Sequence, residues 1–387
     1  MKYRARRIIL IVLIFSLCLF GLLMIYSASF YNAGVRYGDT MHFVKKQAIG
    51  LILGVAGFVF TSLFDYHKYY KLRYPIIIVS IVLLMLVFIP GIGIGANGAR
   101  RWIGVGGFNL QSSEVAKFGF VIFASCYLSK NYDKMDKFKY GLPVLIAGGV
   151  ICLLILLEPN LSVTLCVGSV MLIMLFVGGL RLKHMLMLIV PAVLMLPVLI
   201  IMEPYRLQRL FAFLDPWKSP LEEGFQLIQS LYSLGAGGLF GVGLFNSRQK
   251  YLFLPFSESD FIFSIIGEEF GLVGCIILII VYLLIVYIGI RIAHDALDRL
   301  GVYLATGITA IIAVQTAINV AVVTGTIPPT GIPLPFISAG GTSVSVFLMG
   351  MGILCNVARQ TENSCISIKL KKINTQNFKQ KEIRNVK

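Results

Sequence analysis

The sequence predicts an all-α protein that crosses a membrane many times. Of its 387 residues, 57% are hydrophobic and 13% are charged, and its mean hydropathy is +0.85. A soluble protein of this composition would expose large apolar patches to water. Ten apolar stretches are long enough to cross a bilayer, which takes about 20 helical residues each. The cations gather in alternate connections between these stretches, as in a polytopic membrane protein.

The first predicted span is the apolar run Ile8–Tyr26, which follows four cations in Met1–Arg7. It is longer than the core of about 7–15 residues in a signal peptide, and no soluble domain follows it, so we expect a helix with its N-terminus in the cytoplasm. Nine more spans are expected at residues 47–64, 75–90, 113–129, 141–157, 161–179, 184–203, 262–290, 302–324 and 342–357. Because the number is even, both termini are expected on one side.

The distribution of Lys and Arg predicts the orientation N-in, C-in. Of the 34 cations, 23 fall in the segments that this orientation places in the cytoplasm, and ten fall in the outer connections. This bias follows the positive-inside rule. It also accounts for the net charge of +16, and no nucleic-acid partner is expected.

The membrane domain is expected to cover residues 1–360. Its longest outer loop, about 203–260, joins the seventh and eighth spans, is half apolar, and is expected to lie on the membrane with short helices. The tail 361–387 is polar, basic and rich in Asn and Gln, and we expect it to be disordered in the cytoplasm near anionic headgroups. The seven cysteines and four histidines show no metal-ligand spacing, so no structural zinc site is predicted.

Asp260 is the leading candidate for chemistry, because it stands where the outer loop turns into the eighth span. Glu268 and Glu269 follow about two turns deeper. An ionised carboxylate inside a bilayer costs roughly 2.5 kcal/mol or more, so such acids need a cavity, a partner or a proton. Asp260 is interpreted as a general base or as a helix N-cap, and the two roles are compatible. The two glutamates cannot both face Asp260, and at least one is expected to be a protonated or paired structural acid.

Two pairs of charged residues precede or open the fourth span. Arg100 and Arg101 lie at the predicted outer surface, where guanidinium groups suit phosphate recognition or headgroup anchoring. Glu114 and Lys117 are three residues apart and share a helix face. They form either a buried ion pair or part of a groove for a charged headgroup.

Polar groups also mark the last two spans and their connection. Gln315 and Asn319 are four residues apart, and amides at that depth usually join helices. The proline- and glycine-rich stretch 328–343 breaks helicity at membrane depth, which is tolerated only where the backbone is buried in protein or lines a cavity.

These segments together resemble the SEDS family (shape, elongation, division and sporulation proteins of the FtsW, RodA and SpoVE types). The resemblance covers about residues 7–359 and is carried by 328–343 with Gln315 and Asn319, and by 100–117, 213–217, 226–243 and 260–271. The stretch 246–250 is more similar to the FtsW/SpoVE branch than to RodA.

The resemblance implies a peptidoglycan glycosyltransferase of the bacterial cytoplasmic membrane. Such an enzyme polymerises lipid II, an undecaprenyl-pyrophosphate-linked disaccharide, into β-1,4 glycan strands at the outer face. It works with a class B penicillin-binding protein and with other division or sporulation membrane proteins. By this resemblance Asp260 is the general base that takes the proton of the acceptor sugar's 4-hydroxyl, with inversion at the donor.

The resemblance also implies cations for the pyrophosphate, with Arg101 and Lys117 first among them. A divalent ion, Mg²⁺ or Mn²⁺, is a further way to stabilise that charge; no cofactor is certain. The expected substrate-binding set is Arg100, Arg101, Glu114, Lys117, Arg206, Arg209, Gln226, Arg248, Lys250, Gln315, Asn319, Ser338, Gly340 and Gly341.

The chain departs from the family pattern in four places. Family members usually have aspartate and glutamate where Asn160 and Phe256 stand, which weakens any metal site or second acid built from those positions. They also tend to have proline and glycine at Ser112 and Ser162.

Two other functions compete with the polymerase. A lipid II flippase would use the same cations and cavity without a base, although the chain lacks the internal repeat typical of many transporters. A scaffold for division or sporulation would need no catalysis.

Overall fold

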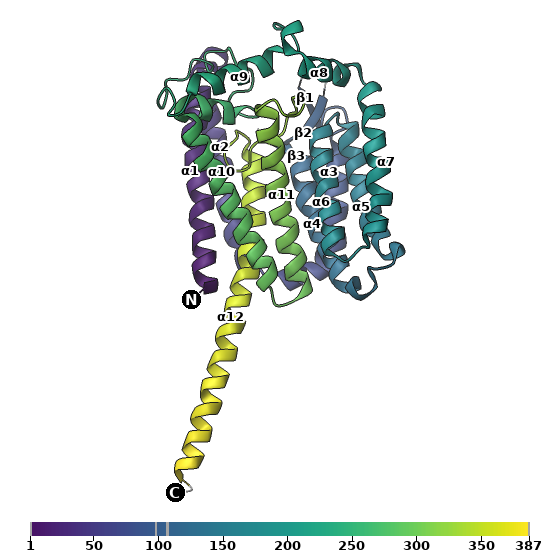
Figure 1. Cartoon of the computed structure of the whole chain (residues 1–387), viewed down its shortest axis with the longest axis vertical. Helices are drawn as coiled ribbons and strands as arrows, with labels where there is room; N and C mark the ends of the chain where they lie inside the picture. Colours follow the sequence, from purple (N-terminus) through teal and green to yellow (C-terminus); the bar gives the residue numbers. More distant parts are fainter. Residues whose placement is uncertain (1, 97–98, 106–107, 386–387) are drawn as a thin grey trace.

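The chain folds into a bundle of long helices. This computed structural model describes residues 2–96, 99–105 and 108–385. Within them ten helices of 17 residues or more run side by side (Figure 1). They are α1 (Lys2–Tyr37), α2 (His42–Leu63), α3 (Tyr69–Leu86), α4 (Ser112–Asn131), α5 (Phe138–Leu157), α6 (Leu161–Val177), α7 (Leu182–Ile201), α10 (Ile262–Asp295), α11 (Arg299–Val323) and α12 (Gly341–Asn385). Short 3₁₀ turns, η1 (Tyr66–Lys68) and η2 (Tyr132–Lys134), precede α3 and follow α4.

Each of the ten helices overlaps one of the ten predicted ranges, and the all-α membrane class is confirmed. Eight helices in the described part of the chain are long and apolar enough to cross a membrane, and α6 is a shorter apolar helix of 17 residues. The remaining helix, α4, has 20 residues and carries Glu114 and Lys117 in its buried face. Both ends of the chain lie on one side of the bundle (Figure 1). The count of ten spans and the N-in, C-in orientation stay predictions.

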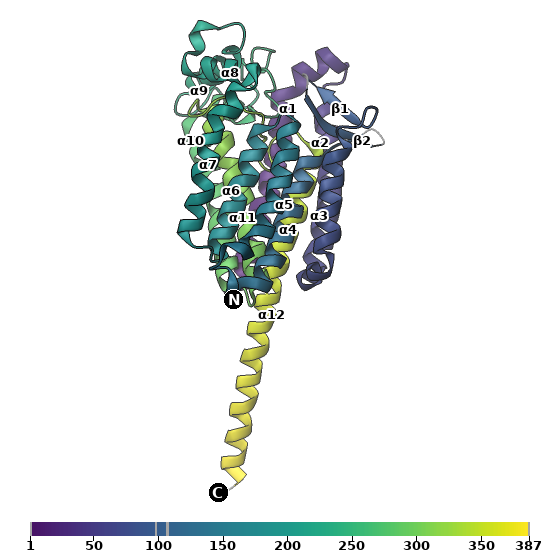
Figure 2. The ribbon, with the colours of Figure 1, turned by 90° about the vertical axis from the view of Figure 1, so that its right-hand side faces the viewer.

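A small antiparallel sheet stands where the sequence analysis expected only a connection. Its strands are β1 (Gly93–Ala96), β2 (Ala99–Val105) and β3 (Phe108–Gln111), with β2 in the middle. Ile94 pairs with Trp102, and Trp102 pairs with Gln111. The sheet lies at the end of the bundle opposite the chain termini, beside α3 (Figure 2). The apolar and β-branched residues in 102–105 were the available sequence signal for a strand.

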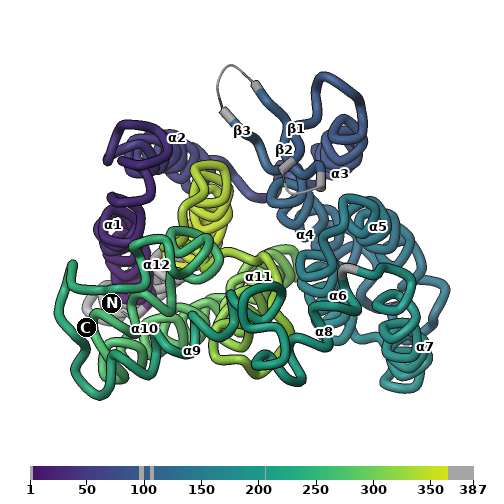
Figure 3. Tube along the Cα trace, turned by 90° about the horizontal axis from the view of Figure 1, so that it is seen from above, coloured from purple at the N-terminus to yellow at the C-terminus, as the bar shows by residue number. Residues whose placement is uncertain are grey.

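The long segment between α7 and α10 contains short helices, as predicted. These are α8 (Pro204–Leu214), the 3₁₀ turn η3 (Pro216–Lys218) and α9 (Phe225–Gly237). They lie across the same end of the bundle as the sheet, and the view from above shows α8 near α6 and α9 near α10 (Figure 3). This segment therefore covers the end at which Asp260 lies, just before α10.

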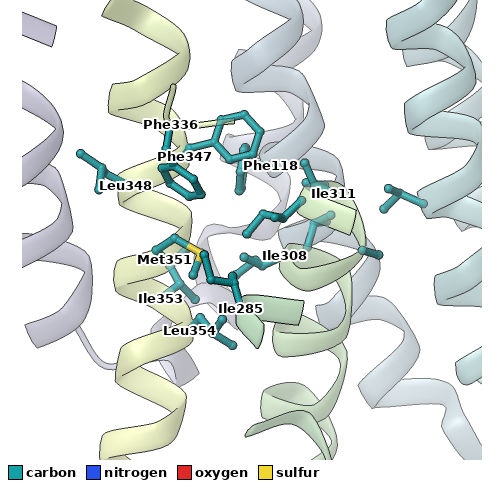
Figure 4. Packing of buried hydrophobic residues seen from close by; sticks show 14 of the residues in the cluster. Phe118, Ile285, Ile308, Ile311, Phe336, Phe347, Leu348, Met351, Ile353 and Leu354 are labelled. Carbon is teal, nitrogen blue, oxygen red and sulfur yellow. The ribbon is translucent and has the colours of Figure 1, made fainter. Parts of the chain in front are cut away.

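The central helices are α11 and α12, whose apolar windows are the most buried, whereas α7 is almost fully exposed along its length. Phe336 and Phe347 pack edge to face above Met351 and Leu354 (Figure 4). Side chains of α4, α10 and α11 complete this core.

Close contact between α2 and α12 depends on glycine. A Cβ at Gly50 would lie 2.4 Å from the backbone of Gly341, so only a hydrogen fits there. The Ser345 hydroxyl donates to the Gly50 carbonyl at 2.6 Å. Small residues at such an interface let helices approach closely and exchange hydrogen bonds.

Helix α10 is broken at Gly271, which has φ 66° and ψ −166°, a conformation that essentially only glycine adopts. The main-chain groups freed by the break are paired with the glycine-rich loop that follows α9. The Glu268 carbonyl accepts from Val242 N, and Leu272 N donates to the Gly238 carbonyl. The break thus joins the outer loop to α10 without leaving these groups unsatisfied.

The segment expected to be a disordered tail continues α12 as a helix to Asn385 and projects away from the bundle (Figure 1). Residues 361–385 contain no proline or glycine to end a helix. Its disorder in water stays a prediction, because a polar helix away from the bundle gains little from packing.

Candidate active site at the outer end of the bundle

Asp260 stands directly before α10 and is not its N-cap. The cap position is Phe261, and no side chain makes a capping hydrogen bond there. The main chain at Asp260 is held from α11, because Asn319 Nδ2 donates to the Asp260 carbonyl at 2.9 Å and to the Ile332 carbonyl at 2.8 Å. The side chain of Asp260 is therefore left for other partners, and the capping interpretation is wrong.

Two arginines place positive charge around the Asp260 carboxylate. The charges of Arg101, on β2, and of Arg209, on α8, both act on it. A Cβ built on Gly331 would lie 3.1 Å from Asp260 Oδ2 and 3.8 Å from an Arg101 terminal nitrogen. Asp260, Arg101 and the backbone of Gly331 therefore meet at one point.

Each arginine is oriented by main-chain carbonyls. Arg101 Nε donates to the Glu158 carbonyl at 3.3 Å, and its Nη2 donates to the Pro159 carbonyl at 2.5 Å. Arg209 Nη1 donates to the Pro329 carbonyl at 3.0 Å. These carbonyls help to orient the two guanidinium groups, and a neutral acceptor does not cancel the charge of the group that it orients.

Burial raises the pKa of Asp260 to about 6, against the opposing charges of Arg101 and Arg209, while the nearby acid Glu258 raises it further. Asp260 is half-buried, so its environment is partly dry. A carboxylate with this pKa is ionised at neutral pH and is a stronger base than an ordinary aspartate.

The stretch 328–340, which directly precedes α12, is called the floor of the site here. It is fixed by buried hydrogen bonds. The Ser338 hydroxyl donates to the Ser259 carbonyl at 2.6 Å and accepts from Leu334 N at 2.7 Å. Gln47, on α2, accepts from Gly340 N at 2.9 Å. Ser338 and Gly340 therefore position the chain next to Asp260 through the backbone.

The ion pair of Glu114 and Lys117 lies beneath this floor, and the buried alternative is the one observed. Lys117 is 1% exposed, and its Nζ donates to Glu114 Oε1 at 2.8 Å and to the side-chain oxygen of Gln315. Gln315 Nε2 in turn donates to the Pro333 carbonyl at 2.9 Å. In this conformation the three residues support the floor, and a headgroup would have to displace these contacts to reach Lys117.

Lys250 has a structural position instead of the expected place among the substrate cations. Its Nζ forms a fully buried ion pair with Glu269 at 3.3 Å and donates to the Phe245 carbonyl at 2.6 Å. Glu269 also accepts from the Ser27 hydroxyl of α1 at 2.6 Å. The pair thus ties the outer loop to α1 and α10.

Glu268 is held by hydrogen bonds, so both glutamates have structural roles. Its carboxylate accepts from the Ser247 hydroxyl at 2.5 Å and from Arg248 N at 2.8 Å. Sequence reasoning expected at least one of them to be a structural acid, and in the structure both are.

The other predicted site residues are spread around this end. Arg100 and Arg248 are exposed. Arg206 Nη1 donates to the Leu199 carbonyl at 2.9 Å, and Gln226 Nε2 donates to the Pro255 carbonyl at 3.5 Å. Gly341 packs against α2. The structure joins Asp260 directly with Arg101 and Arg209 among the predicted cations.

Sequence reasoning missed three residues of this region. Glu158 and Glu258 are buried acids beside Arg101 and Asp260, and Gln47 holds Gly340. Glu158 precedes a proline at a predicted boundary, which was the available signal. Gln47 is the first residue of a predicted span, where a lone amide carries no pattern.

No group of three or more His, Cys, Asp or Glu side chains that could hold a metal ion occurs in the described part of the chain. Asn160, where an acid would serve a metal, caps α6 by accepting from Val163 N at 3.3 Å. The divalent ion that the family resemblance implies stays a prediction.

The fold and this site define a polytopic membrane protein in which the charges of two arginines act on a carboxylate at one end of the bundle. The model of the FtsW/RodA/SpoVE family, described as cell cycle proteins, matches residues 7–363. The chain belongs to this family.

Relatives and solved structures agree with this assignment. Stage V sporulation protein E of Bacillus subtilis is 39% identical over 91% of this chain and 96% of its own length. The probable peptidoglycan glycosyltransferase FtsW of Geobacter metallireducens is 38% identical over 92% and 96%. A chain of a solved peptidoglycan synthase complex superposes with a TM-score of 0.75 at 28% identity, over 91% of this chain and 97% of that one. RodA of Thermus thermophilus shares the fold, with a TM-score of 0.66 at 24% identity, over 91% and 96%.

Proposed function

We propose that the protein is a peptidoglycan glycosyltransferase that polymerises lipid II at the outer face of the cytoplasmic membrane, with Asp260 as general base. The observation that carries this proposal is that the Asp260 carboxylate lies beside Gly331 and Arg101, where the charge of Arg209 also acts on it. The relatives named as peptidoglycan glycosyltransferases support the reaction class. The resemblance to a chain of a peptidoglycan synthase complex supports a class B penicillin-binding protein as partner.

The reaction needs a base and a stabilised leaving group. As the acceptor's 4-hydroxyl oxygen attacks the donor's anomeric carbon, its proton passes to Asp260, and the new glycosidic bond forms. The bond between that carbon and the pyrophosphate oxygen breaks with inversion, and the electron pair stays on the pyrophosphate. Arg101 and Arg209 stabilise this developing negative charge, since the charges of both already act on the Asp260 carboxylate.

The pKa of Asp260, raised to about 6 by burial, predicts the acid side of the pH profile. The base must be ionised to accept a proton, so the rate should fall as the pH drops through about 6. An ordinary aspartate would keep its activity to about pH 4.

The test is Asp260→Asn, purified with its penicillin-binding partner and assayed for glycan chains from lipid II. We expect polymerisation to fall at least about a hundredfold, which is the usual contribution of a general base. Lipid II binding should persist, because the two arginines remain. The matched control is Asp39→Asn, which changes a partly exposed acid in the α1–α2 connection that pairs with Lys45. Full polymerisation by Asp260→Asn would overturn the proposal and favour the flippase or the scaffold.

A further inference from the structure

The loop after α9 forms a protruding apolar tip, residues 238–245. It contains no charged side chain. Its three glycines, at 238, 241 and 243, all have positive φ values, which allow the chain to turn back tightly. The turn leaves Phe240 80% exposed and Leu239 61% exposed. A contiguous group of large exposed apolar side chains marks an interaction site.

Main-chain hydrogen bonds fix the apolar tip to α10, beside the break in that helix. The Leu239 carbonyl accepts from Val273 N at 3.1 Å, and Gly243 N donates to the Glu269 carbonyl at 3.0 Å. These bonds satisfy main-chain groups that a membrane would otherwise leave unpaired. The apolar tip therefore lies at the level of residues 269–273.

Helix α1, which runs along the bundle, gives the depth of that level in the membrane (Figure 1). Its apolar run begins at Ile8, and the Ser27 hydroxyl donates to the Glu269 carboxylate at 2.6 Å. The chain rises by about 1.5 Å per helical residue, so Ser27 stands about 28 Å from Ile8, close to the hydrocarbon thickness of about 30 Å. Glu269 and the apolar tip therefore lie at the outer edge of the hydrocarbon core.

The surfaces on either side of the apolar tip fit this depth. Toward the cytoplasmic end, α10 exposes apolar side chains that include Leu272 and Ile277. Away from the membrane, the rings of Tyr31 and Tyr251 pack edge to face with their centres 4.9 Å apart, and Tyr31 is one helical turn beyond Ser27. Apolar side chains followed by tyrosines are the usual order at a membrane interface.

We propose that the apolar tip inserts into the outer leaflet of the membrane, with Leu239 and Phe240 among the lipid acyl chains next to the headgroups. The competing occupant is a spanning helix of a partner protein. Close packing of two helices needs small residues at the contact. The tip instead presents large side chains on a turn, with nothing within 4 Å of a Cβ built on Gly238. Such a surface fits fluid acyl chains better than a second helix.

The segment that carries Asp260 lies at the same depth. The Ser257 hydroxyl donates to the carbonyl of Ala28, the residue after Ser27, at 3.2 Å. Residues 262–270 connect Asp260 to the attachment of the apolar tip. An inserted tip therefore holds this part of the chain at the headgroups, where a lipid-linked pyrophosphate lies. Only this consequence rests on the proposed function, and the insertion itself does not.

The experiment measures the depth of one tryptophan in the full chain, reconstituted alone into nanodiscs of phosphatidylethanolamine and phosphatidylglycerol. Trp102→Phe and Trp217→Phe remove the two native tryptophans, and Phe240→Trp adds one at the apolar tip. Lipids with a nitroxide near the headgroup should reduce its fluorescence by at least about twofold, because an interfacial side chain lies about 5–10 Å inside the boundary. Lipids with the nitroxide at the chain end should quench it less, and aqueous iodide should quench it little.

The matched control is Leu221→Trp in the same background. Leu221 is 86% exposed and belongs to the connection between α8 and α9, which projects beyond the end of the bundle (Figure 1). Its tryptophan should be quenched by iodide and little by either lipid. If Phe240→Trp gives the pattern of this control, the inference is overturned.

Leu239→Trp is a second reporter and should repeat the pattern of Phe240→Trp; quenching of both by iodide contradicts insertion. Adding the penicillin-binding partner separates the two occupants. Lipid quenching that persists in the complex supports the membrane, whereas its loss would assign the apolar tip to the partner and overturn the proposal. Asp260→Asn measures the proposed function separately, because the quenching needs no catalysis.

Discussion

Replacing Lys250 by methionine should destabilise the protein by about 3–5 kcal/mol, because it leaves Glu269 buried without a counter-charge. Both side chains are 0% exposed, and their N···O distance is 3.3 Å. Methionine is also a long unbranched side chain, so the main loss is the ammonium group, which lies 5.1 Å from the ring centre of Phe30 and 5.9 Å from that of Phe245. The Lys250→Met, Glu269→Gln double variant removes both charges and should recover most of the stability.

The chain contains a matched control with the same distance and a different environment. Lys218 and Asp215 are also 3.3 Å apart, but their side chains are 83% and 42% exposed. Exposed pairs contribute about 0–1 kcal/mol, so Lys218→Met should change stability little. Comparing the two lysine variants therefore isolates burial as the cause of the lost stability.

The assay is the melting midpoint of the purified protein in one detergent, read by fluorescence-detected size exclusion. Lys250→Met should lower the midpoint by on the order of 10 °C. Polymerisation separates the structural role from substrate binding: the double variant should be stable and active. A stable but inactive double variant would show that Lys250 binds substrate, and an unchanged midpoint for Lys250→Met would refute the buried-charge argument.

Three further predictions concern glycines and the buried acid. Gly331→Ala places a methyl group 3.1 Å from Asp260 Oδ2, so polymerisation should fall by about tenfold with an unchanged melting midpoint; a wild-type rate would contradict the geometry. Gly271→Ala should cost about 3 kcal/mol or more, seen as a lower midpoint, because its φ of 66° suits only glycine and its Cβ would lie 2.4 Å from Gly241 N. Finally, folded Glu158 keeps its proton up to about pH 8 while the unfolded chain releases it near 4.5, so stability should fall as the pH rises through this window. Glu158→Gln should abolish that decline in melting midpoint. If the melting midpoints of the wild type and the variant fall in parallel as the pH rises, Glu158 is not neutral in the folded protein.

Much of the fold could be predicted because it depends on local composition. A stretch of about 20 apolar residues specifies a spanning helix wherever it stands, and all ten ranges became helices. The three-stranded sheet was missed because its strands are short and interrupted by glycine, and pairing between neighbouring strands is not a local property.

The candidate site was predictable only in part. Asp260 could be found because an acid at the entrance of an apolar helix is costly without a function or a partner. The role of each cation could not be found in this way. Lys250 and Arg248 are two residues apart in the sequence, yet one is buried against Glu269 and the other is exposed.

The sequence by itself determined the membrane class, the positions of the helices, the family resemblance and the acid before α10. The tertiary structure alone decided which charges meet that acid. Arg101 reaches Asp260 because carbonyls 57 and 58 residues further along the chain orient its guanidinium, while Lys117 is directed to Gln315 beneath the floor. The physical reason is that the sequence specifies how much charge a residue carries, whereas burial and long-range hydrogen bonds determine whether that charge is available to a ligand.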